Sequence, residues 1–253
     1  MRFEKIMALL ILILGAVFAL PSSGFAANTA LVPVPKLEND NYDWYARHER
    51  ILKEAKAMKS EIVLIGDSIT HHWAGINSIG GDDATPYFKA AFKGKRVLNL
   101  GFGWDRIQNM LWRIENGELA GVKPKTVIIM AGTNNMTGTK NARANDAKEI
   151  AEGVLALVKN VRRVVPRNAK IVVMGILPRA GKNDPMRKTA KEANGILSAH
   201  IKKLAKQEPI DFIDLSDKFV DETGERIKTL YKDQVHLSPS GYAIWAESIK
   251  AFL

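Results

Sequence analysis

The hydrophobic pattern centres on the stretch Glu61–Thr70, in which a short apolar run stops at a glycine. Residues Ile62–Ile65 are four consecutive apolar residues, three of them β-branched, as in a strand buried on both faces of a parallel sheet. Gly66 ends the run, and Asp67 and Ser68 then turn the chain toward a helix. A serine on such a turn lies where open α/β sheets place their chemistry. The alternative is that Asp67 or Ser68 only caps the helix.

Further apolar runs follow, separated by segments of helical periodicity. We expect strands at Arg96–Leu100, Thr126–Met130, Lys170–Ile176 and Ile210–Leu215. We expect helices near 42–58, 106–116, 144–165 and 186–206, and a last one from Pro239 that Ser238 caps. Strands that alternate with helical segments indicate βαβ units, and right-handed crossovers place helices on both faces of the resulting parallel sheet. The sequence therefore predicts an α/β protein, a three-layer α/β/α sandwich with a five-stranded parallel sheet.

The amino terminus has the pattern of a secretory signal. Arg2 and Lys5 precede an apolar run from Ile6 to Leu20, which is followed by small residues up to Ala27. The run is shorter than the roughly 20 residues that a membrane span needs. We expect residues 1–26 to be a cleaved signal peptide, with an uncleaved anchor as the alternative. The mature protein is then secreted or periplasmic, without stable membrane insertion. Residues 27–60 form a lead-in and a first helix, and residues 61–253 form one domain.

Composition narrows the classes of function. The formal net charge is +10, but no block of five or six like charges occurs, which favours a solvated basic surface and no nucleic-acid partner. Attraction to an acidic polysaccharide or an anionic membrane face is a weaker alternative. The chain has no cysteine, so disulfides, thiolate catalysis and cysteine-ligated zinc are excluded.

Polar residues follow successive strands at their carboxyl ends, which meet at one edge of a parallel sheet. In chain order they are Ser68, the loop Gly101–Trp104, Asn134, and finally Asp233 and His236. A serine hydroxyl needs a base, and an imidazole needs a carboxylate to hold its tautomer. Backbone N–H groups and an amide can stabilise the oxyanion of an acyl-transfer intermediate. This set therefore predicts a serine acyl hydrolase.

These residues resemble the four motif blocks of the SGNH, or GDSL, hydrolase family, in the family's order and with similar spacing. The blocks are Gly66-Asp67-Ser68, the Gly101–Trp104 loop, Gly132-Thr133-Asn134-Asn135 and Asp233-x-x-His236. The stretches Asn99–Trp104, Leu111–Leu119 and Leu177-Pro178-Arg179 look most like the subgroup related to the small platelet-activating-factor acetylhydrolase subunits. The resemblance covers about Glu61 to Phe252 and implies a flavodoxin-like SGNH fold.

The resemblance implies a triad of Ser68, His236 and Asp233. It also implies an oxyanion hole from the Ser68 N–H, an N–H of the glycine loop and the Asn134 amide. Where many members have glycine before the aspartate, this chain has Trp104, whose N–H can still donate and whose ring would crowd or line the acyl pocket. Gly103 is the second candidate donor. Candidate substrate contacts are Asp67, Trp104 and Arg179.

Several rival interpretations fail on the residues. The third glycine of a dinucleotide fingerprint beginning at Gly101 would fall at Arg106. His71 and His72 are adjacent and lack a metal-ligand spacing, so we expect no metal and place them in a pocket wall or behind the site. His48 and His200 lie in helical segments as surface or packing residues. Asp105 is expected to brace its loop, Asn99 to support the site or contact substrate, and Trp73 and Trp112 to belong to the core. No cofactor is expected.

The main hypothesis is an exported serine esterase that cleaves short acyl esters, most simply acetyl esters, of a small molecule or a glycan. The same residues could instead transfer an acyl group to a carbohydrate hydroxyl. A non-catalytic glycan-binding protein on the same scaffold is the alternative from another class. The alcohol half of the substrate and the oligomeric state cannot be inferred from the sequence.

Overall fold

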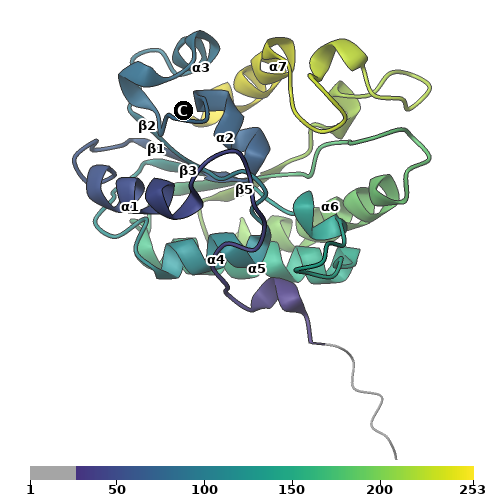
Figure 1. Ribbon diagram of the computed structural model, residues 1–253, viewed down its shortest axis with the longest axis horizontal. Coiled ribbons are helices and arrows are strands. Elements are labelled where there is room, and N and C mark those ends of the chain that lie inside the picture. The colour runs from purple at the N-terminus through teal and green to yellow at the C-terminus, as the bar shows by residue number, and fades with distance from the viewer. Residues whose placement is uncertain (1–26) are drawn as a thin grey trace, which may run out of the picture.

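A five-stranded parallel sheet with the order β2-β1-β3-β4-β5 lies at the centre of the computed structural model, which describes residues 27–253 (Figure 1). The strands are β1 (Ile62–Gly66), β2 (Val97–Gly101), β3 (Thr126–Met130), β4 (Lys170–Met174) and β5 (Ile210–Ile213). This order is that of flavodoxin-like sheets, in which the direction of winding changes between β1 and β3. The predicted α/β fold is confirmed. The predicted signal peptide lies outside the described residues.

Helices cover both faces of the sheet (Figure 1). One layer contains α1 (Trp44–Glu54), α4 (Ile107–Glu115), α5 (Ala147–Val164) and α6 (Pro185–Leu204). The other contains α2 (Ser68–Ala74), α3 (Pro86–Ala91) and α7 (Pro239–Ile249). Short 3-10 turns are η1 (Thr29–Leu31), η2 (Gly81–Asp83), η3 (Asn134–Met136), η4 (Ser216–Lys218), η5 (Lys228–Leu230) and η6 (Lys250–Phe252). Within residues 27–253, no helix is both long and apolar enough to cross a bilayer.

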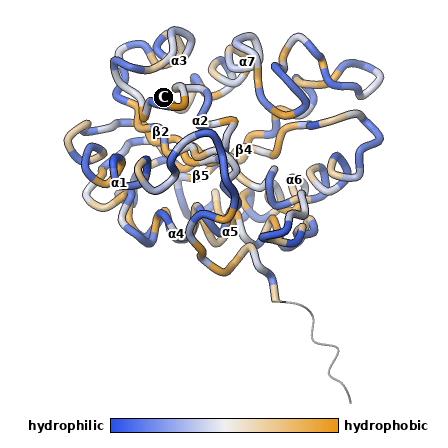
Figure 2. Tube along the Cα trace, viewed as in Figure 1, coloured by the Kyte–Doolittle hydropathy of each residue, from blue (hydrophilic) through white to orange (hydrophobic). Residues whose placement is uncertain are grey.

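The sheet separates two apolar cores because successive strand side chains point to opposite faces. In β1, Val63 and Ile65 join the core under α4 and α5, whereas Ile62 and Leu64 join the core under α7. Accordingly, hydrophobic residues gather along the strands at the centre of the molecule, and the outer loops are mainly hydrophilic (Figure 2). Burial on both faces explains why the strand runs are continuously apolar.

Local capping sets the helix ends more tightly than periodicity predicts. The first helix begins at Trp44 rather than near 42, because the Asp43 side chain accepts the N–H groups of Tyr45 and Ala46. The predicted helix at 144–165 begins at Ala147, where Asp146 and Glu149 form a capping box. The fourth and fifth strands are two residues shorter than expected, ending at Met174 and Ile213. The α3 helix lies in a segment for which no element was predicted.

Two paired glycines at the ends of β1 and β2 allow α2 to approach the sheet. Gly66 and Gly101 are partners in the register of the sheet. A Cβ on Gly101 would lie 2.2 Å from the backbone nitrogen of His71, and one on Gly66 would lie 2.8 Å from the carbonyl oxygen of Met130. Because these neighbours are backbone atoms, His71 could not move without displacing α2, which begins at Ser68, and Met130 could not move without displacing β3.

We therefore predict that Gly101→Ala lowers the free energy of unfolding by about 3 kcal/mol or more. Gly195→Ala is the matched control, because Gly195 lies inside α6 and a Cβ there meets nothing within 4 Å. That substitution should raise the free energy of unfolding by about 0.5–1 kcal/mol. Urea denaturation of the two variants measures both values. Equal stability of Gly101→Ala and the wild type would contradict the close approach of α2.

Candidate active site

The serine of the first motif is the first residue of α2. The Asp67 side chain accepts the N–H of Ile69 at 2.9 Å and so caps the helix, whose first residue is Ser68. Ser68 is 7% exposed. Its N–H is among the first-turn donors that have no partner inside a helix, and it meets no acceptor within residues 27–253. The start of the helix thus directs both a hydroxyl and a free N–H to the carboxyl edge of the sheet.

Asp233 and His236 occupy one tight turn between η5 and α7. Asp233 Oδ1 accepts the N–H groups of Val235 and His236 at 2.7 and 2.8 Å. Asp233 Oδ2 is 2.7 Å from His236 Nδ1, and His236 Nε2 is 2.9 Å from Ser68 Oγ. The structure therefore brings the three predicted side chains into one hydrogen-bonded chain, although 168 positions separate Ser68 from His236.

The charge of Asp233 is held in place by these contacts. Burial by itself would raise the pKa of Asp233, but hydrogen bonds from the His236 N–H, the imidazole and the Val235 N–H outweigh it and lower the pKa to about 2. The carboxylate is therefore ionised at neutral pH. An ionised carboxylate at Nδ1 places the imidazole proton there and leaves Nε2 as an acceptor for the Ser68 hydroxyl.

The predicted oxyanion donors differ in whether their N–H groups already donate a hydrogen bond within the protein. Asn134, at the start of η3, uses one amide hydrogen on the carbonyl of Asp105 at 3.0 Å, which leaves the other hydrogen available. The Gly103 N–H donates to His71 Nδ1 at 3.1 Å. Gly103 was expected as the second candidate donor; this contact occupies its N–H, and its role in the oxyanion hole stays a prediction. The Trp104 N–H meets no acceptor within the described chain.

Trp104 has an unusual backbone conformation, with φ of +62° in a residue that carries a side chain. A left-handed conformation costs roughly 1–2 kcal/mol for such residues and persists only where the surroundings enforce it. The neighbouring contacts of Gly103 and Asp105 supply that constraint. Trp104 is 41% exposed and follows β2 at the same sheet edge as Ser68.

A model of the GDSL-like lipase/acylhydrolase family matches residues 64–244. The chain belongs to this family. It is 31% identical over 235 residues to platelet-activating factor acetylhydrolase IB subunit alpha1 of Rattus norvegicus, with 91% of each chain covered. It is 30% identical over 219 residues to the alpha2 subunit of Homo sapiens, with 86% of each covered. The resemblance predicted from the motifs is confirmed, and the protein is a carboxylic ester hydrolase.

Solved structures support the fold of this GDSL hydrolase. A GDSL-like lipase from Bacteroides thetaiotaomicron matches with a TM-score of 0.59 and 22% identity, over 82% of this chain and 97% of that chain. An acetylxylan esterase from Geobacillus stearothermophilus matches with a TM-score of 0.58 and 22% identity, over 76% and 93%. At this identity the likeness concerns the arrangement of the backbone.

Behind the glycine loop, the GDSL hydrolase buries a network of charges that the sequence did not reveal. Asp105 accepts Trp44 Nε1–H at 2.7 Å and Arg113 Nε–H at 2.8 Å, and its carbonyl accepts the Asn134 amide. Arg113 also pairs with Glu118, which pairs with His48 at 2.8 Å. Burial raises the pKa of Asp105, and the Arg113 guanidinium opposes that rise. Asp105 therefore links the loop that carries Trp104 to Asn134, as its predicted bracing role requires.

Two guanidinium groups lie against the aromatic ring of the loop. Arg47 and Arg113 lie 5.0 and 3.9 Å from the ring centroid of Phe102. Arg47 donates to the carbonyls of Gly101 and Asn99 at 3.0 and 3.1 Å. The sequence contains one signal for these buried guanidinium groups. Arg113 follows Met110 by three positions along α4, so this charged residue lies on the same face of the helix as an apolar one.

Three further residues that the sequence placed at or near the site are Asp67, Arg179 and Asn99. Asp67 is 1% exposed and caps α2, and its substrate contact stays a prediction. Burial raises its pKa to about 6, against the opposing effect of the Ile69 N–H. Arg179 is half-buried and donates to the carbonyl of Thr133 at 3.2 Å, beside Asn134, so its substrate contact stays a prediction. Asn99 joins β2 to α2 through the carbonyl of Thr70 at 2.7 Å.

The other histidines and tryptophans also have defined places. His71 is buried, and its ring nitrogens meet Gly103 N–H and the carbonyl of Ile76 at 2.9 Å. The His72 ring lies 4.7 Å from the His236 ring. His48 packs in the interior, His200 is exposed, Trp73 is a core residue, and Trp112 packs half-buried against the core. Among the described residues, no group of three or more histidines and carboxylates could hold a metal ion.

The burial of His71 predicts how the stability of the protein depends on pH. Burial lowers its pKa to about 2 in the folded protein, whereas imidazole in an unfolded chain titrates near about 6.5. The unfolded chain therefore takes up this proton first, so the contribution of His71 to stability is present above about pH 6.5 and is lost as the pH falls. Relative to His71→Gln, the wild type should lose about 1.4 kcal/mol per pH unit below that point.

Urea denaturation of the wild type and His71→Gln at a series of pH values measures this difference. Glutamine keeps a donor and an acceptor for the neighbouring backbone groups. The difference between the two proteins, rather than the wild-type curve alone, isolates His71, because Asp67 and Asp105 titrate with the opposite sign. A constant difference across the acid range would refute the buried neutral imidazole.

Proposed function

We propose that this hydrolase is an exported serine esterase that cleaves short acyl esters, most simply acetyl esters, by way of an acyl-enzyme. The observation that carries the proposal is the chain of contacts from Asp233 through His236 to Ser68, with 2.7 and 2.9 Å between the heavy atoms. A nucleophile, a base and a group that orients the base are the elements of covalent acyl transfer.

The proposed mechanism has two half-reactions, formation of the acyl-enzyme and its hydrolysis. Ser68 Oγ attacks the ester carbonyl carbon while its proton passes to His236 Nε2. The resulting oxyanion accepts hydrogen bonds from the N–H groups of Ser68 and Trp104 and from the Asn134 amide. His236 then returns the proton to the departing alcohol. A water molecule, losing its proton to His236, attacks the acyl-enzyme, and collapse of that intermediate releases the acid and restores Ser68.

The geometry gives physical support to the proposed oxyanion hole. Its three donors come from the start of α2, the loop after β2 and the turn after β3, which are neighbours in the sheet. Asp105 joins the second and third of these elements, and removal of one such donor typically costs about 10²–10³ in rate. The donors are thus fixed before the substrate arrives.

Support for the acetyl preference and for export comes from other observations. The relatives at 30–31% identity are acetylhydrolase subunits. Export is supported by the basic, apolar and small-residue order of residues 1–26. Mass spectrometry of the mature amino terminus tests it, and an intact Met1 in a membrane-bound chain would overturn cleavage.

The first prediction of the mechanism concerns Ser68. Ser68→Ala removes the nucleophile and should lower kcat for p-nitrophenyl acetate by about 10⁴-fold or more, with an unchanged fold. Ser198→Ala is the matched control, because Ser198 is exposed on α6. Steady-state kinetics on both variants measures the effect. Turnover in Ser68→Ala equal to that of the control would exclude the proposed nucleophile.

A second prediction concerns what is transferred, and to which acceptor. With p-nitrophenyl esters of increasing chain length, kcat/KM should be highest for acetate and fall for longer chains. Addition of acetylated and free oligosaccharides to the same assay separates hydrolysis from acyl transfer, since transfer gives acylated sugar instead of free acid. Activity that rises with acyl length would contradict the acetyl preference, and a yield of acylated sugar above that of free acid would establish a transferase.

A further inference from the structure

The amino ends of the strands, opposite the edge that holds Ser68, have an excess of exposed basic residues in the connecting loops. We define the basic edge as Lys56, Lys59, Lys93, Lys95, Lys123 and Arg167, all of which are exposed. Lys56, Lys59 and Lys123 line one shallow depression, and Lys93 and Lys95 line the next. Arg96 lines both depressions, so the two adjoin at this residue.

The basic edge continues across the sheet toward α5 and α6. The N–H of Lys170 donates to the carbonyl of Lys125 at 2.8 Å, which joins the starts of β3 and β4. Arg162 donates to the carbonyl of Pro209, just before β5, at 3.2 Å. With strands about 4.8 Å apart, five strands give a surface roughly 20 Å wide. A flat anionic surface that touches this edge comes within a Debye length, about 8 Å, of its exposed charges.

Most acidic residues at this edge are already paired, and the exception is exposed Asp82, which lines the depression of Lys93 and Lys95. Glu61 contacts Arg96 and Lys125, Asp211 contacts Lys170, and Glu208 contacts Arg162. None of the six residues of the basic edge has an ion-pair partner within residues 27–253. The edge therefore has an uncompensated positive charge.

Helix stabilisation explains only part of this charge. Basic residues in the last turn of a helix complement the negative end of its dipole, and Arg162, Arg163, Lys202 and Lys203 occupy such positions. The basic edge extends past the reach of that effect, because Lys95 follows α3 by four residues and Lys123 follows α4 by eight, in turns and loops. Its cations are therefore available to an external partner.

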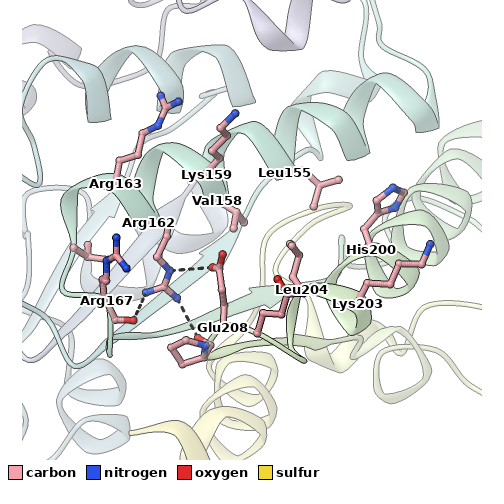
Figure 3. Close-up of a pocket in the computed structure, with 13 residues that line it drawn as sticks. Leu155, Val158, Lys159, Arg162, Arg163, Arg167, His200, Lys203, Leu204 and Glu208 are labelled. Carbon is pink, nitrogen blue, oxygen red and sulfur yellow. Dashed lines mark hydrogen bonds and ion pairs between the residues drawn. The ribbon is translucent and has the colours of Figure 1, made fainter.

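An apolar groove adjoins one end of the basic edge (Figure 3). The groove lies between α5 and α6 and has a volume of about 1030 Å³. Leu155, Val158 and Leu204 line it together with Lys159, Lys203 and Arg167. Leu204 is 37% exposed. Apolar surface among cations matches a partner that has both anionic groups and hydrocarbon.

We propose that the basic edge docks this enzyme on an anionic lipid bilayer, with Leu204 and the α5–α6 groove against the interfacial acyl region. A soluble polyanion would use the cations and leave the apolar residues exposed, so the combination favours a lipid surface. Because the triad lies at the opposite edge of the parallel sheet, docking leaves Ser68 facing the aqueous phase. The docked enzyme then acts on esters outside the bilayer. This inference does not depend on the roles proposed for Ser68 and His236.

The test uses residues 27–253, which contain the whole sheet and both apolar cores. Sedimentation with vesicles of mixed phosphatidylglycerol and phosphatidylcholine is compared with vesicles of phosphatidylcholine alone. The edge variant has Lys93→Glu, Lys95→Glu, Lys123→Glu and Arg167→Glu. The control variant has Lys140→Glu, Lys148→Glu, Lys188→Glu and Lys191→Glu, with the same change in net charge on exposed residues away from the basic edge.

The wild type should bind the anionic vesicles and lose binding as salt is added. Each basic residue near an anionic surface contributes about fivefold to affinity, so the edge variant should bind at least about a hundredfold more weakly. The control variant should change by about threefold or less. Turnover of p-nitrophenyl acetate by the bound wild type should equal that of the free protein.

Three results would overturn the proposal: equal binding to phosphatidylcholine alone, equal weakening in the two variants, or binding to dextran sulfate without binding to vesicles. Loss of turnover on docking would overturn the orientation. Circular dichroism and esterase activity of the edge variant in solution show whether it is folded. If the edge variant is unfolded, the single substitutions Lys95→Glu and Lys123→Glu test the proposal instead. Each is expected to weaken vesicle binding about fivefold or more.

Discussion

The close approach of α2 to the ends of β1 and β2 is the constraint on which the site depends. Only glycine fits at positions 66 and 101, since any Cβ there would overlap atoms within 2.2 Å. The approach is fixed further by the Asn99 amide on the carbonyl of Thr70 and by the Tyr242 hydroxyl on the carbonyl of Ile69, both at 2.7 Å. Because α7 supplies Tyr242 and directly follows the turn of His236, the same packing brings the imidazole to Ser68.

The second requirement is a rigid loop after β2, and buried charges provide it at a cost in desolvation. Arg113, Asp105 and Glu118 are all nearly inaccessible to solvent. Such groups are costly to bury and strongly destabilising when one partner is removed. In return, the loop has few alternative conformations, because its carbonyls, carboxylate and aromatic ring all meet fixed guanidinium groups. Trp104 consequently keeps its left-handed backbone, and Asn134 keeps its orientation through Asp105.

The parallel sheet also divides the electrostatics of the molecule. The carboxyl edge gathers ionisable groups in close, hydrogen-bonded contact, and its acids are engaged with Arg113, His236 and backbone N–H groups. The amino edge gathers exposed cations in loops. All strands point the same way, so chemistry and surface charge face opposite directions, and one edge can contact a surface while the other remains open to substrate.

The sequence by itself determined the parallel α/β fold, the family, and the residues that follow each strand, because strand burial and motif order are local properties of the chain. It could not determine which N–H of the glycine loop is free, since His71 takes that of Gly103 only through tertiary contact. It also placed Asp67 among the substrate contacts, although its turn buries it as a cap. The network of Arg47, Arg113 and Glu118 was likewise decided by tertiary structure, because charged residues look solvent-exposed until their partners from distant elements meet them in the interior.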